Sequence, residues 1–476
     1  MSRPFPKDEP TLQGVFAPVF VEGDAFDLPV TGEIPKALNG AFYRNGANPQ
    51  FAPRGRHHWF GGDGMVHAFT LENGRASYRN RWVRTPRFEL ERKAGKALFG
   101  LFGDPTTSDP SVIGKDTGVA NTHIIYHAGK LLALEESHLP FEMTRSLDSV
   151  GYYTFGGLLP TTVEGRFTAH PKIDPENGEL VGFSYPGTDI FGTRMSLIII
   201  GANGELVRQD FFEAPYSSLV HDFLVTRDHV VFPILPLAGD AARAKRGGSI
   251  WAWDPSKPAM LGVVGRRAPI SSLTWHRIPA CYVFHTFNAW EDGGSIHCDV
   301  IKYGRAPLFP DVEGNPTPPG SAIGMPVRWS IDLTGRTAEV KETQLTDVTG
   351  EFPRLDERRA GVNYSHAFYN TNGPGRSSRQ ALFNAVAQLD LASGRTALFA
   401  APDGDSLGEP VFAPRSAQSP EGDGFLLTLQ YIREENRSDL LILDASDLEN
   451  GSVARVHLSH RVPAGFHGSW VPASES

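Results

Sequence analysis

Four of the sixteen histidines lie in segments of apolar or small residues, where burying an imidazole without a partner would be costly. They are His170, His221, His285 and His467. A metal ion would satisfy one ring nitrogen of each, because neutral imidazole is a common ligand of iron, zinc and copper. Four core histidines, each bonded to a backbone carbonyl, would account for the same residues. Composition and spacing alone do not decide between these two interpretations.

The four histidines are far apart along the chain, and none belongs to a local metal motif such as His-Glu-x-x-His. Ligands scattered in this way require a fold that brings distant segments to one point. The inner strands of a β-propeller do so, because they all run close to a central axis. A metal site made of these residues therefore predicts a closed β architecture.

Three glutamates adjoin apolar or proline-bounded segments, where a carboxylate without a partner is uncommon. They are Glu136, Glu351 and Glu409. A metal-bound histidine usually donates its other ring N–H to a carboxylate or a carbonyl, so these glutamates are candidates to hold the histidines. Ordinary ion pairs with nearby arginines such as Arg354 and Arg415 are the alternative explanation.

The elements that would position these residues are mostly β-hairpins. Strand-like runs flank turns that contain Asn-Gly, Ser-Gly or Thr-Gly, and glycine supplies the positive φ that tight hairpins need. The chain has 50 Gly and 37 Pro, which implies many turns, and the best helical pattern covers residues 87–101. No low-complexity linker divides the chain. We expect one all-β domain, a propeller or a large sandwich, with hairpins at 68–78, 172–180, 199–206, 331–337, 389–396 and 441–458.

The composition narrows the class of protein. The formal net charge is −9, with 45 Lys+Arg against 54 Asp+Glu, which argues against a nucleic-acid-binding protein. No apolar run approaches the roughly 20 residues of a membrane span, and the first residues lack the apolar core of a signal peptide. Cys281 and Cys298 are too few for a disulfide framework. These features predict a cytoplasmic protein.

Several motifs, taken in order, resemble the carotenoid cleavage oxygenase family, which includes enzymes that cleave apocarotenoids, stilbenes and phenylpropenes. Each motif alone is weak, but together they extend over nearly the whole chain. They are GAFYRNGANPQ at 40–50, WFGGDGMVHAF at 59–69, ANTH at 120–123, TAHP at 168–171, HDF at 221–223, EFPR at 351–354, APR at 413–415 and HGSW at 467–470.

This resemblance implies a seven-bladed β-propeller with a small helical and loop cap over its top face, formed by residues 1–476 as a single domain. It implies one Fe(II) per chain, bound by His170, His221, His285 and His467. Glu136, Glu351 and Glu409 match the glutamates that support these ligands, and Thr122 matches a threonine beside the open coordination position. The expected reaction is oxidative cleavage of a C=C bond to two carbonyl products, with O₂ as co-substrate and no organic cofactor.

The sequence points in two directions on the substrate. Residues 81–89, 96–105 and 109–112 resemble the lignostilbene and isoeugenol branch, in which a tyrosine and a lysine engage the phenolic oxygen. Phe102 and Glu135 occupy those two positions here, so phenol activation is in question because Phe has no hydroxyl and Glu repels a phenolate. A carotenoid or apocarotenoid is the main expectation, and a lignostilbene or phenylpropene is the alternative.

Trp59, Phe60, Phe102 and Glu135 are the expected substrate-pocket residues. The chain has 30 Phe, 12 Tyr and 8 Trp, enough to line an apolar tunnel for a lipophilic or aromatic alkene. Residues 97–102 would either dip into a membrane surface as a peripheral contact or pack against the propeller. A propeller that binds an apocarotenoid without catalysis is a third hypothesis, and the sequence does not indicate an oligomeric state.

Overall fold

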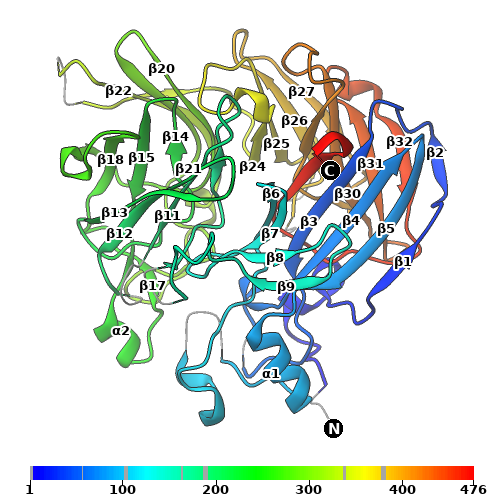
Figure 1. The fold of residues 1–476 in the computed structure, drawn as a ribbon, viewed down its shortest axis with the longest axis horizontal. Helices are drawn as coiled ribbons and strands as arrows, with labels where there is room; N and C mark the ends of the chain where they lie inside the picture. Colours follow the sequence, from blue (N-terminus) through cyan, green and yellow to red (C-terminus); the bar gives the residue numbers. More distant parts are fainter. Residues whose placement is uncertain are drawn as a thin grey trace. The chain divides into compact units, whose positions relative to one another are not determined.

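Antiparallel strands make up nearly all of the regular structure in the computed structural model (Figure 1). The structure describes residues 4–55, 57–100, 105–161, 165–185, 191–335, 339–376 and 382–475. Within these ranges the α-helices are α1 (Pro86–Ala94) and α2 (Ala241–Lys245). The same described ranges form seven sheets of four or more strands, beside a ribbon formed by β16 (Leu237–Gly239) and β17 (Trp251–Trp253). This confirms the predicted fold class, a seven-bladed β-propeller.

The chain divides into two compact units. The first comprises Met1–Thr154, Gly373–Ala385 and Phe399–Ser476, and the second comprises Phe155–Asn372 and Val386–Leu398. Both units are built from consecutive hairpins, and each sheet is one blade of the fold class.

One sheet of the first unit joins the two ends of the chain. Strand β33 (Gly468–Pro472) pairs with β3 (Gly40–Ala47), so the red carboxyl-terminal strand lies beside a blue amino-terminal strand in Figure 1. The sheet continues through β4 (Gly64–Glu72), β5 (Arg75–Trp82) and β1 (Gly23–Ala25). Because His467 directly precedes β33, this pairing fixes where that histidine enters the sheet.

The described part of the first unit contains two further sheets, one a series of hairpins and one in which a strand from near the amino terminus pairs with a strand from near the carboxyl terminus. One consists of β6 (His123–His127), β7 (Lys130–Leu134), β8 (Phe141–Met143) and β9 (Ser149–Tyr152). The other consists of β2 (Val30–Gly32), β32 (Ser452–His457), β31 (Arg437–Asp444), β30 (Gly424–Ile432), β29 (Val411–Pro414) and β28 (Ser406–Leu407).

The second unit contains four sheets of four strands. They are formed by β10 (Lys172–Ile173), β11 (Leu180–Ser184), β12 (Arg194–Ile200) and β13 (Leu206–Glu213); by β14 (Leu224–Val225), β15 (His229–Ile234), β18 (Ala259–Gly265) and β19 (Thr274–Ile278); by β20 (Tyr282–Asp292), β21 (Ser295–Tyr303), β22 (Met325–Asp332) and β23 (Lys341–Gln344); and by β24 (Glu351–Leu355), β25 (His366–Thr371), β26 (Ala385–Asp390) and β27 (Thr396–Ala400), whose last residues extend into the first unit.

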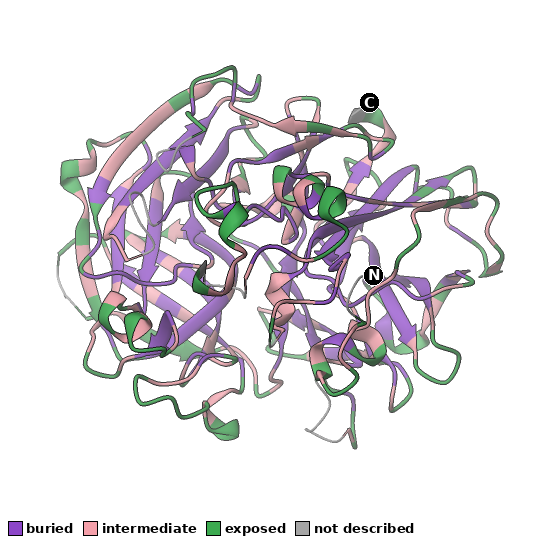
Figure 2. Ribbon diagram, turned by 90° about the horizontal axis from the view of Figure 1, so that it is seen from below, coloured by how far each residue is buried: buried purple, intermediate pink, exposed green. Residues whose placement is uncertain are grey.

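The hairpins form where the turn residues predict them. Between β4 and β5, Asn73 and Gly74 both have positive φ, 51° and 77°, as a two-residue turn of the primed type requires. Most strand residues of the described ranges are buried, while exposed residues gather in the connecting loops (Figure 2). Fully buried side chains such as Phe42, Phe69 and Ile442 pack into one apolar cluster of the first unit. Each contributes about 1.5–3 kcal/mol by burial.

Helix α1 is shorter than the sequence predicts. The pattern indicated a helix over residues 87–101, but α1 ends at Ala94, because Gly95 adopts a left-handed conformation with φ of 66° and caps the last turn. At the other end, Thr85 accepts a hydrogen bond from the Phe88 N–H.

Two apolar residues of the predicted patch 97–102 are packed, while Leu101 and Phe102 lie outside the described residues. Leu98 and Phe99 are buried in a small cluster with Val112, against Leu90 of α1, and the Glu91 carboxylate accepts both of their backbone N–H groups. These two side chains therefore offer no free surface for a membrane contact. No helix of the described ranges is both long and apolar enough to cross a membrane.

Candidate metal centre

Three of the four predicted ligands converge within the second unit. The Nε2 atom of His221 lies 3.1 Å from Nε2 of His170 and 3.1 Å from Nε2 of His285. The ring centroids of the three imidazoles are 4.5–5.1 Å apart. The residues are separated by 51 and 64 positions in sequence. The sheets of the second unit therefore bring scattered histidines to one point.

Each of these histidines lies at the start of a different sheet. His170 comes two residues before β10, and its backbone N–H donates to the Thr168 hydroxyl at 2.9 Å. His221 comes three residues before β14. His285 lies within β20, where the register with β21 shifts twice around Thr286. Such β-bulges reorient a side chain without ending the strand.

A carboxylate fixes the third ring. The Nδ1 atom of His285 lies 2.5 Å from Oε2 of Glu351, which is 7% exposed. The same oxygen accepts the backbone N–H of Phe352, whose φ is 56° and whose ring stacks on the imidazole at 5.5 Å. A left-handed conformation costs about 1–2 kcal/mol for such a residue, so the fold strains its backbone where it orients His285.

These residues fit a bound divalent metal ion. Because His285 donates its Nδ1 proton to Glu351, its Nε2 atom presents a lone pair toward His221. A single proton on His221 Nε2 can satisfy only one of its two contacts at 3.1 Å. A cation among the three Nε2 atoms would satisfy all of them, and neutral imidazoles suit iron, zinc or copper.

The fourth predicted ligand has the same kind of support, in the first unit. The Nδ1 atom of His467 lies 2.8 Å from Oε1 of Glu409, and Oε2 of Glu409 accepts the Gly468 N–H at 2.9 Å. His467 and Glu409 are 4% and 1% exposed. With the proton on Nδ1, the lone pair of His467 lies on Nε2, which is the tautomer that binds a metal through Nε2.

Thr122 is connected to His467 through the backbone. The His467 N–H donates to the Thr122 carbonyl at 3.1 Å, and the Thr122 hydroxyl donates to Asn121 Oδ1 at 3.0 Å. The Asn121 amide in turn donates to the carbonyls of Phe60 and Gly62 at 2.9 and 2.7 Å. A continuous hydrogen-bonded path therefore joins a predicted ligand to the loop that carries the predicted aromatic pocket.

Two of the three predicted aromatic pocket residues contact Phe466, the residue before His467. Trp59 and Phe60, in the 3₁₀ turn η3 (Trp59–Gly61), contact the ring of Phe466 with centroids 4.8 and 5.7 Å apart. Phe16 packs edge-on against Trp59 at 5.3 Å. Trp59 and Phe60 are partly exposed, so their rings form an apolar surface next to a predicted ligand.

The other predicted pocket and supporting residues differ in their surroundings. Glu135 is 8% exposed, accepts the Val119 N–H at 2.9 Å and pairs with Nδ1 of His138 at 2.7 Å. Glu136 is half-buried, two residues after β7. Phe102 lies outside the described residues.

Sequence reasoning missed several polar residues next to the ligands. Lys172, Asp222 and Thr286 follow His170, His221 and His285 by one or two positions and contact one another. Asn121 precedes Thr122, and Tyr303 lies beside Glu351, where burial and the carboxylate raise its pKa well above the ordinary value. The available signal was their position next to candidate ligands. Successive side chains of a strand face opposite sides, so a neighbour of a ligand can bond to other segments while the ligand faces the metal.

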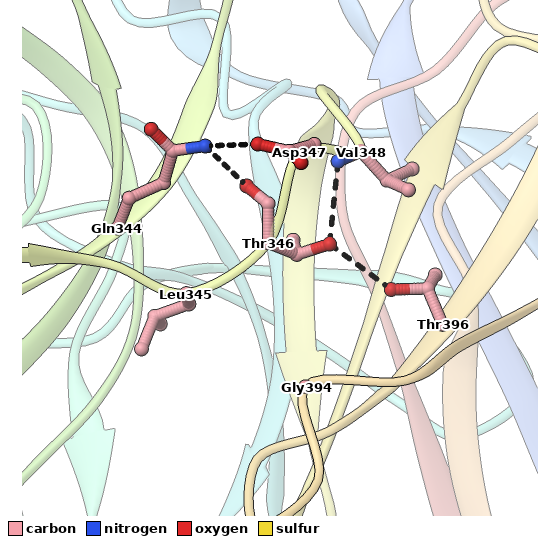
Figure 3. Close-up of a pocket in the computed structure, with 7 residues that line it drawn as sticks. All are labelled: Gln344, Leu345, Thr346, Asp347, Val348, Gly394 and Thr396. Atoms are coloured by element: carbon pink, nitrogen blue, oxygen red, sulfur yellow. Dashed lines mark hydrogen bonds between the residues drawn. The ribbon is translucent and has the colours of Figure 1, made fainter.

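A separate cavity of about 470 Å³ lies in the second unit, at the turn after β23 (Figure 3). Its polar groups bond to one another: the Thr346 and Thr396 hydroxyls are 3.2 Å apart, and the Gln344 amide donates to Asp347 at 2.6 Å. No predicted site residue lines it. The lining residues are Gln344, Leu345, Thr346, Asp347, Val348, Gly394 and Thr396.

Comparison with known proteins identifies the family. The family model described as RPE65, retinal pigment epithelial membrane protein, matches residues 16–472. The chain belongs to this family. It is 39% identical to isoeugenol monooxygenase of Pseudomonas nitroreducens over 98% of both chains. The solved lignostilbene dioxygenase of Pseudomonas brassicacearum superposes with a TM-score of 0.94 at 35% identity, covering 99% of this chain and 100% of that one.

A more distant structural relative carries a metal. The cobalt-substituted Synechocystis apocarotenoid oxygenase superposes with a TM-score of 0.83 at 30% identity, covering 96% of this chain and 97% of that one. These matches over full length confirm the resemblance seen in the motifs. The chain is therefore an oxidoreductase of the carotenoid-oxygenase type.

Proposed function

We propose that this protein is a non-haem iron oxygenase that cleaves the C=C bond of an aromatic alkene, of the isoeugenol or lignostilbene kind, to two carbonyl products. The observation that carries the proposal is the convergence of the His170, His221 and His285 Nε2 atoms in a chain whose similar relatives are named for these two substrates. The sequence led us to rank a carotenoid first, and the comparisons favour the aromatic alternative.

From the resemblance, His170, His221, His285 and His467 would hold the iron, and the whole chain 1–476 would act as one domain. Iron bound there would supply the capacity to bind and activate O₂. Glu351 and Glu409 hold the protons of His285 and His467 on Nδ1. We assign a similar supporting role to Glu136 from the resemblance.

The remaining tasks of the protein are placement and exclusion of water. Trp59, Phe60 and Phe466 offer an apolar surface against which an aromatic ring can stack. Thr122, whose carbonyl holds the His467 backbone, is proposed to lie beside the open coordination position. An alkene held there in a near-attack position would react without the entropy cost of a bimolecular encounter.

Glu135 limits the ability of the proposed pocket to stabilise the phenolate form of a substrate. Its carboxylate is engaged by the Val119 N–H and by His138, and a carboxylate cannot stabilise a phenolate. We therefore propose that the substrate's hydroxyl is bound as the neutral phenol, or that the oxygen carries an alkyl group. Either form is also compatible with phenylalanine, which has no hydroxyl, at the position that the resemblance assigns to Phe102.

Product analysis tests the proposal. Iron-loaded enzyme would be incubated with O₂ and an equal mixture of isoeugenol, a hydroxystilbene and an apocarotenal, and the aldehydes would be separated. Aromatic aldehydes as the main products support the proposal. Polyene aldehydes alone would reverse the ranking in favour of a carotenoid cleavage oxygenase. Tight binding of an apocarotenal without turnover or iron would support a non-catalytic binding protein.

A further inference from the structure

A buried carboxylate links the segments that carry three of the histidines. Asp222 directly follows His221 and is 3% exposed. Its Oδ1 atom lies 2.8 Å from the Lys172 ammonium group, and its Oδ2 atom accepts the Thr286 N–H at 2.8 Å and the Thr286 hydroxyl at 2.9 Å. Lys172 comes two residues after His170, and Thr286 comes directly after His285.

The contact with Thr286 is made where the strand ladder is interrupted. The register of β20 against β21 shifts on both sides of Thr286, so its N–H bonds to Asp222. This N–H belongs to the peptide unit that joins His285 to Thr286. Anchoring this N–H therefore holds the peptide unit next to His285 and constrains the backbone from which the imidazole projects.

The contacts of Asp222 form one closed cluster. The Phe223 N–H donates to Oδ1 at 2.8 Å, the Thr286 hydroxyl also lies 3.3 Å from the Phe223 carbonyl, and the Lys172 ammonium lies 3.4 Å from the Thr286 hydroxyl. A buried carboxylate with a paired cation and several N–H or O–H donors is favourable only in this geometry. The cluster therefore resists relative movement of the three segments that meet in it.

We propose that Lys172, Asp222 and Thr286 form a positioning network that sets the spacing of His170, His221 and His285 for the metal. The network acts on the backbone of the ligand segments. Glu351 acts differently, since it fixes the orientation of one imidazole ring. The inference rests on the proposed metal centre and adds to it three residues that never touch the ion.

Cobalt(II) binding to the metal-free protein tests the network, because the visible absorption bands of bound cobalt report the ligand geometry independently of turnover. Asp222→Asn removes the charge and replaces one acceptor by a donor. We expect it to weaken cobalt binding about 10–100-fold and to shift the absorption bands. Thr286→Val should act in the same direction, and Thr286→Ser, which keeps the hydroxyl, should recover most of the affinity.

Asp299→Asn is the matched control. Asp299 is also fully buried, and its carboxylate bonds to Arg328 at 2.7 and 2.9 Å and to the Tyr364 hydroxyl at 2.9 Å. Its loss should lower the thermal unfolding midpoint in the way that the loss of Asp222 does. We expect it to leave cobalt affinity and spectrum as in the wild type, because it contacts no ligand segment through its carboxylate.

Asp222→Asn protein with the affinity and spectrum of the wild type would overturn the inference, and so would an equal loss of affinity in Asp299→Asn. If Asp222→Asn does not fold, Lys172→Met decides: a cobalt affinity within about twofold of the wild type overturns the network. A wild-type protein that binds no cobalt refutes the metal centre itself, so the two failures are distinguishable.

Discussion

Two glutamates hold two histidines through different hydrogen-bond patterns, and the same isosteric substitution should therefore have unequal effects. In Glu351, a single oxygen, Oε2, accepts both His285 Nδ1 and the Phe352 N–H. In Glu409, Oε1 accepts His467 Nδ1 and Oε2 accepts the Gly468 N–H. We predict that Glu409→Gln weakens metal binding more than Glu351→Gln.

The magnitude follows from the donors that each glutamine must meet. Glutamine at 351 can place its oxygen where Oε2 lies and keep both bonds, and the nearby Tyr303 hydroxyl can turn to accept from the amide. Only the charge is lost, which we expect to cost about tenfold in metal affinity, or about 1.4 kcal/mol. Glutamine at 409 must also set its NH₂ group against an N–H donor, at a further cost of about 1–3 kcal/mol. Its affinity should fall roughly 100- to 1000-fold.

The Glu409→Gln substitution has a second expected effect, on the tautomer of His467. The donor conflict is relieved if His467 moves its proton to Nε2, but that tautomer cannot bind a metal through Nε2. Cobalt titration of metal-free wild type and both variants measures the order directly. Glu357→Gln is the control, since the Glu357 side chain is 56% exposed and pairs with Arg354. Equal losses in the two variants, or a larger loss at 351, would refute the reasoning.

Three further predictions follow from the same structure. His221→Ala should lose bound iron and activity together, measured by metal analysis and aldehyde production, because its Nε2 atom lies 3.1 Å from both neighbouring ligands. Phe102→Tyr combined with Glu135→Lys should raise cleavage of a hydroxystilbene at least severalfold; iron-loaded protein without a gain would contradict our assignment of those two positions. The hydrogen bond to Glu291 raises the pKa of His229. The stabilisation by the His229–Glu291 pair is therefore complete below pH 6.5 and is lost as pH rises through the raised pKa. The decrease in the free energy of unfolding caused by Glu291→Gln, measured by urea unfolding, should therefore be smaller at pH 8 than at pH 6.

The fold could be predicted because its signals are local. Turns such as Asn73-Gly74 specify hairpins through backbone conformation alone, and repeated hairpins imply an all-β domain, either a propeller or a large sandwich. The resemblance of the motifs implied the seven blades. The end of α1 could not be placed as well, because the apolar residues after Gly95 continue a helical pattern. Two of these residues, Leu98 and Phe99, are buried without being helical, because their N–H groups donate to the Glu91 side chain.

The candidate metal centre could be predicted only in part. Histidines among apolar residues stand out in the sequence, but the residues that set their spacing do not. Asp222 and Thr286 are 64 positions apart, and their contact depends on a β-bulge that no composition or periodicity reveals. Long-range contacts of this kind arise from the packing of sheets, so a single sequence shows the candidate ligands but not the residues that we propose position them.

The residues that we expect to determine the substrate lie in loops, and loops show no hydrophobic periodicity from which their positions could be predicted. Glu135 was assigned to the pocket by its place between motifs, which suggested a free carboxylate facing the substrate. In the structure its carboxylate is shared between the Val119 backbone and His138, three residues along the chain. The side chain that replaces a lysine is thus compensated by its own loop, and the pocket need not use a charge at this position. For that reason we give the full-length similarity to enzymes of aromatic alkenes more weight in the proposed function than the two departures at Phe102 and Glu135.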